Sequence, residues 1–271
     1  MYLIIDIGGT KTLIAMFNKH GRILRKFKFK TPESKSEFLA TLKSALVPFS
    51  SKYREKTEQI IIAVPGEIKN NIATKFGNRP WKNLDFVQEL KNLFSCSVIL
   101  KNDADLATVY ESSFHKGLTL YLTFSTGIGG GLARRGKLTK NSASVEPGHI
   151  SYIYNGKSLE WEDIASCSAI GAHYGCQATS VRGREAYSDI AQRVALGLPE
   201  LIQRYRPDCI VIGGPLTLQF SHFIKELRFL VRSKLPASRT LPRFVPARRP
   251  KEAVVYGGYH YAKNLSRSQK S

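Results

Sequence analysis

The stretch that decides the fold is Asp6-Ile7-Gly8-Gly9-Thr10-Lys11-Thr12, which lies between two apolar runs, Tyr2 to Ile5 and Leu13 to Phe17. Apolar runs on both sides of two glycines indicate two strands joined by a tight hairpin. Glycine permits positive φ and close approach to the backbone, so the turn is expected to leave amide N–H groups open to a ligand. The next three residues add hydroxyl and ammonium donors. The hairpin is therefore predicted to hold phosphate oxygens, although an ordinary Gly-Gly hairpin has the same pattern.

Asp6 ends the first apolar run and is placed like a carboxylate that holds Mg²⁺ through water. Mg²⁺ prefers one or two carboxylates together with phosphate oxygens. The hairpin lacks the Gly-Lys-Ser/Thr ending of a Walker loop, and the strand expected after its glycines distinguishes it from a dinucleotide fingerprint. The expected ligand is a phosphate chain with its Mg²⁺.

The length and composition favour a two-lobed protein without a membrane segment. A chain of 271 residues exceeds the usual size of one domain, and its hydrophobic fraction of 42% suffices for a core. No run of about 18 apolar residues and no charged-then-apolar leader is present, so we expect a cytoplasmic protein. The cysteines are scattered and indicate neither a disulfide framework nor a structural metal. They are Cys96, Cys167, Cys176 and Cys209.

The net charge of +20 is concentrated in two parts of the chain. Residues 227–251 contain eight basic residues and no acidic one, and residues 19–30 contain six basic residues. A basic excess attracts polyanions, but charge runs are also common on solvated surfaces. A solvated basic face, polyphosphate binding and nucleic-acid binding are therefore all left open.

The second half of the chain repeats the opening pattern of strand, glycine turn and strand. Leu118 to Phe124 is followed by Ser125-Thr126-Gly127-Ile128-Gly129-Gly130-Gly131 and then by an apolar run from Leu132 to Leu138. This self-similarity predicts a duplicated unit. Two such halves would place two phosphate hairpins across one cleft. The buried strand expected at Cys209 to Ile212 ends in Gly213-Gly214, where a ribose or phosphate can approach.

Hydrophobic periodicity and helix-boundary signals predict the main helices. A cap at Ser34 or Ser36 begins the first of them, and Asp103 lies near the start of the second, where it also fits a helix cap. The residues after 264 are expected to form a loose tail. The predicted helices cover residues 32–48, about 104–115, about 184–205, to about 235 from the glycines at 213–214, and 251–264.

Together these stretches resemble the ROK family of sugar kinases and sugar-responsive repressors over nearly the whole chain. Each motif is short, but their order and spacing are specific. The matching stretches are the hairpin at 6–12, Val64-Pro65-Gly66, Gly77-Asn78-Arg79-Pro80-Trp81, Asn102-Asp103-Ala104, Thr126-Gly127-Ile128-Gly129-Gly130-Gly131, Glu146-Pro147-Gly148-His149 and Ile212-Gly213-Gly214.

The resemblance implies a two-lobed, actin-like (ribonuclease-H-like) α/β fold with a central cleft. It implies a small lobe at 1–104, with the helix at 251–264 packed back on it, and a large lobe at 105–250. Asp103 would be the general base that accepts a hydroxyl proton during phosphoryl transfer. The implied sugar-binding residues are Gly66, Asn78, Asn102, Asp103, Glu146, His149 and Glu162. The implied phosphate- or nucleotide-binding residues are Asp6, Gly8, Gly9, Thr10, Lys11, Thr12, Thr126, Gly127, Gly129, Gly213 and Gly214.

Several choices stay open within this resemblance. Glu162 has the family's Glu-x-x-Ala-Ser spacing, and Glu160 is the competing sugar ligand. No zinc is expected, because the family's cysteine-rich loop is missing after His149. The pattern is similar to that of zinc-free and polyphosphate glucokinases, which implies ATP, polyphosphate or both as donor, with Arg248 and Arg249 on the basic surface.

The expected reaction is transfer to the 6-hydroxyl of glucose. Fructose, mannose, N-acetylmannosamine and N-acetylglucosamine are the alternative acceptors, because the implied sugar ligands bind hydroxyls that most hexoses share. A sugar-responsive regulator is the alternative from another class, but its helix-turn-helix would precede a hairpin that here starts near Met1. Nucleic acid is therefore not expected as a partner, and the resemblance implies a homodimer.

Overall fold

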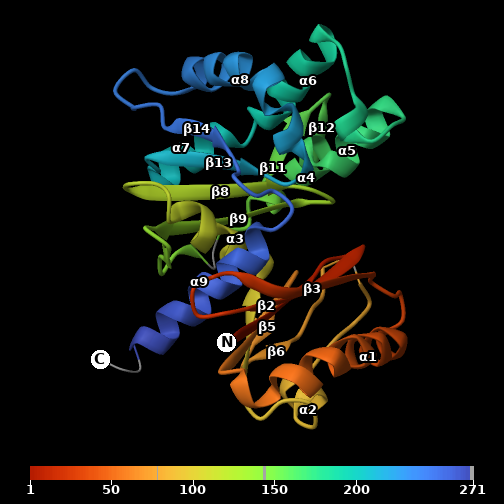
Figure 1. The fold of residues 1–271 in the computed structure, drawn as a ribbon. Helices are drawn as coiled ribbons and strands as arrows, with labels where there is room; N and C mark the ends of the chain where they lie inside the picture. Colours follow the sequence, from red (N-terminus) through yellow and green to blue (C-terminus); the bar gives the residue numbers. More distant parts are fainter. Residues whose placement is uncertain (78, 143–144, 269–271) are drawn as a thin grey trace. The chain divides into compact units, whose positions relative to one another are not determined.

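The computed structural model describes residues 1–77, 79–142 and 145–268, and the chain divides into two compact units. The first unit comprises residues 1–110 with the C-terminal residues from Val254, and the second comprises residues 111–253. Each unit contains a mixed five-stranded sheet with helices (Figure 1). The predicted α/β class is confirmed.

In the first unit the strand order is β3-β2-β1-β4-β7. The first three strands form an antiparallel meander, and β4 and β7 run parallel to β1. The strands are β1 (Tyr2–Ile7), β2 (Lys11–Phe17), β3 (Ile23–Lys30), β4 (Gln59–Val64) and β7 (Ser97–Asn102), with a small hairpin of β5 (Ile68–Lys69) and β6 (Ile72–Ala73). The helices are α1 (Lys35–Tyr53), the 3-10 turn η1 (Arg54–Lys56), α2 (Phe86–Leu90), α3 (Asp103–Ser112) and α9 (Ala253–Ser268).

Both faces of this sheet are buried near its centre, which is why β1 is a continuous apolar run. Successive side chains of a strand point to opposite faces. Leu3 and Ile5 pack with Phe38 and other residues of α1, whereas Ile4 packs with Tyr259 and other residues of α9. The core thus fixes β1, and with it the hairpin that follows.

The second unit repeats the same plan with the strand order β10-β9-β8-β13-β14. β9 is antiparallel to β8, and β13 is parallel to β8, so the predicted duplication is confirmed. The strands are β8 (Leu118–Phe124), β9 (Ile128–Arg134), β10 (Lys137–Leu138), β13 (Cys209–Gly213) and β14 (Arg243–Pro246), with a separate hairpin of β11 (Ser151–Tyr154) and β12 (Lys157–Glu160). The helices are α4 (Trp161–Ala165), α5 (Cys167–Tyr174), α6 (Arg184–Val194), α7 (Leu198–Tyr205) and α8 (Phe220–Lys234), with 3-10 turns η3 (Pro147–His149), η4 (Ala178–Ser180) and η5 (Pro215–Gln219).

The helix predicted from 184 to 205 is wrong as a single element, because it is broken between α6 and α7. Gly197 precedes α7, and a Cβ at Gly197 would lie 2.6 Å from the buried indole of Trp161. Pro199 lies in the first turn of α7, where its missing N–H is tolerated, whereas inside a continuous helix it would remove a hydrogen bond.

Two other predicted helix boundaries also change. Ser34 caps α1 by accepting a hydrogen bond from the Glu37 amide at 3.2 Å, which decides between the two candidate caps, and the helix runs through Pro48 to Tyr53. α9 begins at Ala253 and continues to Ser268, so residues 265–268 are not a loose tail. Among the described residues, no helix has both the length and the apolar character needed to cross a membrane.

Candidate active site

The β1–β2 hairpin is closed by backbone pairing on both sides of its glycines. Asp6 pairs with Leu13 in the sheet register, and the Gly8 amide donates to the Lys11 carbonyl at 3.0 Å. Neither Gly8 nor Gly9 has positive φ, so the prediction that the turn needs glycine for a positive φ is wrong. A Cβ on Gly9 would meet no atom within 4 Å. The turn therefore provides open space beside the backbone, as a phosphate loop requires.

Two side chains from outside the hairpin hold its turn. The Thr31 hydroxyl donates to the Gly8 carbonyl at 2.9 Å and lies 2.9 Å from the Thr12 hydroxyl. Arg79 donates to the Gly9 carbonyl and, at 3.2 Å, to the Thr31 carbonyl. Sequence reasoning gave neither Thr31 nor Arg79 a role, because these contacts join residues 19 to 70 positions apart in the chain.

Asp6 and Asp103 are electrostatically coupled in the first unit. Burial raises the pKa of the Asp6 carboxyl from 3.8 to about 7, the negative charge of Asp103 contributes to that rise, and Lys28 acts in the opposite direction. Like charges that share a site disfavour ionisation of one another. Two carboxylates at the carboxyl end of the sheet, next to the glycine hairpin, are a donor set that suits Mg²⁺, which would offset their repulsion.

Asn102 performs the capping role that was considered for Asp103. The Asn102 Oδ1 accepts hydrogen bonds from the amides of Ala104, at 2.9 Å, and Asp105, at 3.2 Å. Asp103 also accepts from the Ala104 amide at 2.8 Å and is part of the first turn of α3. Residue 102 therefore fixes the start of the helix, and it fixes the backbone that carries the Asp103 carboxylate.

Gly66 lies just beyond the end of β4, and Asn102 is the last residue of the neighbouring parallel strand β7. Val64 pairs with Asn102 in the register of β4 and β7, and the Asn102 side-chain amide reaches the Gly66 carbonyl at 3.5 Å. Gly66 has φ +101°, and a Cβ there would lie 2.7 Å from the Lys75 carbonyl oxygen, so glycine is required. The predicted sugar ligand Asn78 lies outside the described residues.

In the second unit, the β8–β9 turn is built around the carboxylate of Glu162. The Glu162 Oε2 accepts a hydrogen bond from the Ile128 amide at 3.2 Å. Cβ atoms added at Gly127 and Gly148 would lie 2.5 and 2.6 Å from the same oxygen. Gly127, which the sequence assigned to phosphate binding, therefore also makes room for a predicted sugar ligand, and so does Gly148.

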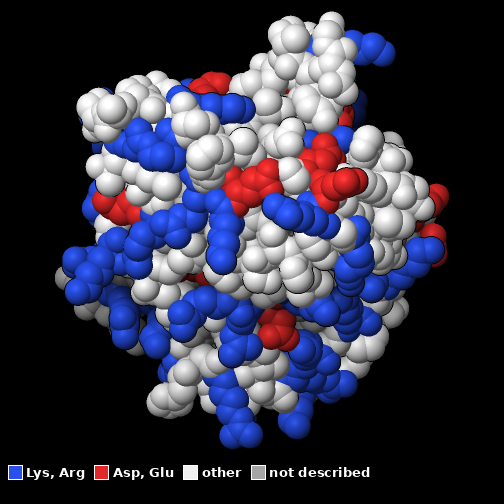
Figure 2. Space-filling model, turned by 90° about the horizontal axis from the view of Figure 1, so that it is seen from above, with Lys and Arg blue, Asp and Glu red and all other residues white. Residues whose placement is uncertain are grey.

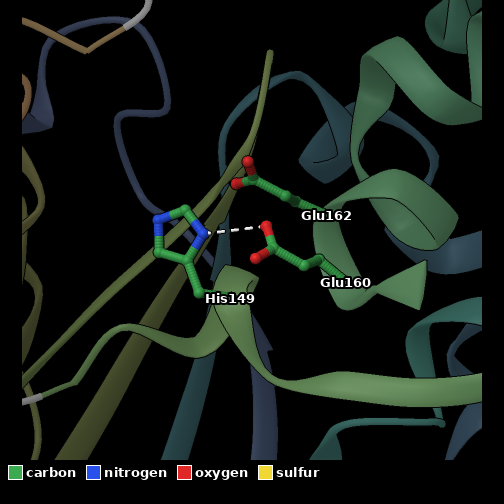
Figure 3. Close-up of side chains that lie close together, drawn as sticks. All are labelled: His149, Glu160 and Glu162. Atoms are coloured by element: carbon green, nitrogen blue, oxygen red, sulfur yellow. Dashed lines mark hydrogen bonds and ion pairs between the residues drawn. The ribbon is translucent and has the colours of Figure 1, made fainter. Parts of the chain in front are cut away.

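His149 and Glu160 form an ion pair beside Glu162 (Figure 3). The His149 Nδ1 lies 3.0 Å from Glu160 Oε2, and one ligand atom from each of the three residues lies within 4.8 Å of the others. The hydrogen bond to Glu160 raises the pKa of the His149 imidazole, against the opposing effect of burial. The sequence indicated no cysteine ligands near His149, whereas the fold brings two carboxylates close to it. The expected absence of zinc stays a prediction.

Gly213 and Gly214, at the end of β13, are required by packing. A Cβ on Gly213 would lie 2.2 Å from the Tyr121 hydroxyl oxygen, and one on Gly214, at φ +72°, would lie 2.3 Å from the Phe124 carbonyl oxygen. Their role in binding a nucleotide stays a prediction, as does the role of Glu146 in binding the sugar.

These features define a class of protein. Two mixed sheets of the same strand order, each opening with a glycine hairpin, and the likeness to solved sugar kinase structures identify the actin-like ATPase fold, as predicted. The chain belongs to the ROK family, whose model matches residues 2–264. It is a sugar kinase of that family, which confirms the enzyme class predicted from sequence.

Several of the similar proteins are kinases that are named for different sugars. The N-acetylmannosamine kinase of Salmonella heidelberg (strain SL476) is 25% identical over 265 residues, covering 86% of this chain and 89% of that protein. The structure of a ROK family glucokinase from Streptomyces griseus in complex with glucose and AMPPNP has a TM-score of 0.76 and 21% identity, covering 97% of this chain and 99% of that one. The inorganic polyphosphate/ATP-glucomannokinase of Arthrobacter sp. strain KM has a TM-score of 0.73 and 24% identity, covering 98% of each chain.

Proposed function

We propose that this sugar kinase transfers a phosphoryl group from ATP to the 6-hydroxyl of a hexose, with glucose as the first choice and Asp103 as the general base. The observation that carries the proposal is the coupling of Asp103 to Asp6 beside an open glycine hairpin. Phosphoryl transfer needs a positioned acceptor, a carboxylate to take its proton and neutralisation of the phosphate charge. The first unit offers the groups for the last two needs.

The proposed roles follow from the match of these residues to the motifs of the ROK family. Asp103 accepts the proton of the attacking hydroxyl. Asp6 would hold Mg²⁺ through water, and the ion would neutralise charge on the donor phosphates. The hairpin glycines and Lys11 bind those phosphates. Gly66, Asn78 and Asn102 in the first unit, and Glu146, His149 and Glu162 in the second, are each proposed to bind sugar hydroxyls. Polar groups that bind a hydroxyl reject an analogue that lacks it.

Inorganic polyphosphate is proposed as an additional donor. The net charge of +20 favours a polyanionic partner, and Lys and Arg side chains cover much of the face drawn in Figure 2, where Asp and Glu form a few groups. A similar structure is named as a polyphosphate- and ATP-dependent glucomannokinase. Binding of a phosphate chain to such a surface should weaken steeply with salt.

N-acetylmannosamine is the second candidate acceptor. The relative from Salmonella heidelberg carries that name and matches most of the chain. Glucose is supported by the similar glucokinase from Streptomyces griseus, whose structure is a complex with glucose and AMPPNP. Both sugars offer a 6-hydroxyl, so the proposed chemistry is the same for each.

A coupled kinase assay separates these candidates. Glucose, mannose, fructose, N-acetylglucosamine and N-acetylmannosamine are each tested with ATP and with polyphosphate, and kcat/KM is compared. We expect the highest value for glucose, and NMR of the product should show phosphate at the 6-position. A higher kcat/KM for N-acetylmannosamine than for glucose would make N-acetylmannosamine the preferred acceptor. No turnover of any of these hexoses would contradict the proposed function.

A further inference from the structure

The lysines of β3 alternate with its aromatic residues, and the two kinds lie on opposite faces of the sheet. Arg25 contacts α1, where its guanidinium carbon lies 5.2 Å from the centre of the Phe49 ring. Side chains alternate along a strand, so Phe27 and Phe29 share the face of Arg25, whereas Lys28 and Lys30 point to the other face. Both lysines are exposed.

The sheet register places these lysines in line with the hairpin. Lys28 pairs with Leu13, and Leu13 pairs with Asp6, so the three residues form one row across β3, β2 and β1. Lys30 pairs directly with Lys11, which begins β2 after the turn. Paired side chains lie on the same face. Lys11, Lys28 and Lys30 therefore share the face of Asp6.

A pair of like charges directly opposite each other destabilises a sheet. Lys11 and Lys30 are such a pair, and both are exposed. Among the described residues, neither these two nor Lys28 forms an ion pair with an acidic side chain. Lys28 is close enough to Asp6 to oppose the larger effects of burial and of Asp103 on the pKa of that carboxyl. Three cations without acidic partners beside a phosphate loop suit a ligand with several adjacent negative charges.

We propose that Lys28 and Lys30, together with Lys11, form an outer phosphate site that holds a chain of inorganic polyphosphate beyond the group being transferred. The inference rests on the proposed kinase function and adds a site on β3 to it. The site continues from the hairpin along an edge strand, which rises about 3.4 Å per residue.

The chemistry of this face favours polyphosphate over nucleotides or nucleic acid. Sites for single-stranded nucleic acid combine a basic groove with aromatic side chains on which bases stack. Here Phe27 and Phe29 are turned to the opposite face, so the face of Lys28 presents ammonium groups without an aromatic platform from β3. A ligand made only of phosphates can use every one of these contacts.

The test compares a double variant with a control of equal charge. Lys28→Gln/Lys30→Gln removes the proposed site, and Lys56→Gln/Lys91→Gln removes two exposed lysines elsewhere in the first unit. Binding of long-chain polyphosphate is measured at several salt concentrations, without sugar, so that it does not depend on turnover. KM for polyphosphate and for ATP is then measured with the best sugar.

We expect the site variant to bind polyphosphate at least tenfold more weakly than the control. The slope of log K against log salt should fall by about 1.4 for two lost phosphate contacts, at roughly 0.7 per contact on a flexible chain. KM for ATP should stay within twofold of wild type. The melting temperature should not fall, because a like-charge pair has been removed.

Three results would overturn the outer phosphate site. They are equal polyphosphate binding by the site variant and the control, an equal loss of ATP and polyphosphate use, and competition by single-stranded DNA at the same charge concentration as effectively as by polyphosphate. If wild type turns over sugar with ATP but binds no polyphosphate, the outer phosphate site is contradicted and the kinase function is not. If wild type binds polyphosphate but turns over no sugar, the kinase function is contradicted and the outer phosphate site is not.

Discussion

Asp6→Asn should make the stability of the first unit less dependent on pH. The wild-type carboxyl has a pKa of about 7 in the folded protein, chiefly because of burial and next because of Asp103. An unfolded chain releases this proton near pH 4, so between pH 4 and pH 7 the folded state binds more protons. The free energy of unfolding therefore falls as pH rises through this window and is level above it. Asparagine has a similar shape and does not titrate.

The size of the effect follows from the width of that window. A difference of one pKa unit corresponds to about 1.4 kcal/mol. Between pH 5 and pH 8 the free energy of unfolding of wild type should therefore fall by up to about 2.7 kcal/mol through this group. The fall occurs over the two pH units below its pKa of about 7. Asp6 keeps partial contact with solvent, which makes this an upper limit. The free energy of unfolding of the variant minus that of wild type should therefore be larger at pH 8 than at pH 5.

Hydrogen exchange of peptides from β1 and β2 measures this stability in the first unit alone. The free energy of opening is compared for wild type and Asp6→Asn at pH 5, 6, 7 and 8, so that other titrating groups cancel. With Mg²⁺ and ATP added at pH 8, wild type should gain protection, and the variant should gain much less. A difference between the two proteins that does not change with pH would refute the assignment of a raised pKa to Asp6.

Three further changes test the packing and the polar contacts of the site. Gly197→Ala places a Cβ against the Trp161 ring and should lower the free energy of unfolding of the second unit by about 1–3 kcal/mol, read as a lower melting temperature; an unchanged value would contradict the packing that separates α6 from α7. Glu160→Gln should lower the pKa of His149 in an NMR titration, because the Glu160 carboxylate stabilises the protonated imidazole. The ion pair stabilises the fold below the pKa of the unfolded histidine, and this stabilisation is lost as pH rises through the raised pKa of the folded state. An unchanged pKa of His149 in the variant would exclude the pair. Arg79→Met should raise KM for ATP by about tenfold, since one charged hydrogen bond contributes about 1.5 kcal/mol, and an unchanged KM would show that the hairpin holds its shape without it.

The fold could be predicted because its signals are local. The hairpin at 6–12 and its counterpart at 125–131 are read from glycines between apolar runs, and the two sheets have the same strand order. The break between α6 and α7 has a local signal in Gly197 and Pro199, which the helical periodicity outweighed, and a distant cause in Trp161, more than 30 positions from Gly197. Helical periodicity continues across such a break.

The site was less predictable, because its contacts join distant segments. The sequence placed glycines at the hairpin, but it did not indicate that Arg79 and Thr31 hold the turn. It left Glu160 and Glu162 as alternatives, whereas the structure gives one a bond to His149 and the other a bond to the Ile128 amide. Which of these carboxylates binds the sugar stays a prediction.

The kcat of Asp103→Asn with the best hexose and ATP gives the sharpest test of the proposed mechanism. Removal of a general base should lower kcat by about 10²- to 10⁴-fold. The melting temperature should stay close to that of wild type, because Asn102 accepts both amide bonds that start α3. A variant that phosphorylates the sugar at the wild-type rate would contradict the assignment of Asp103 as the base.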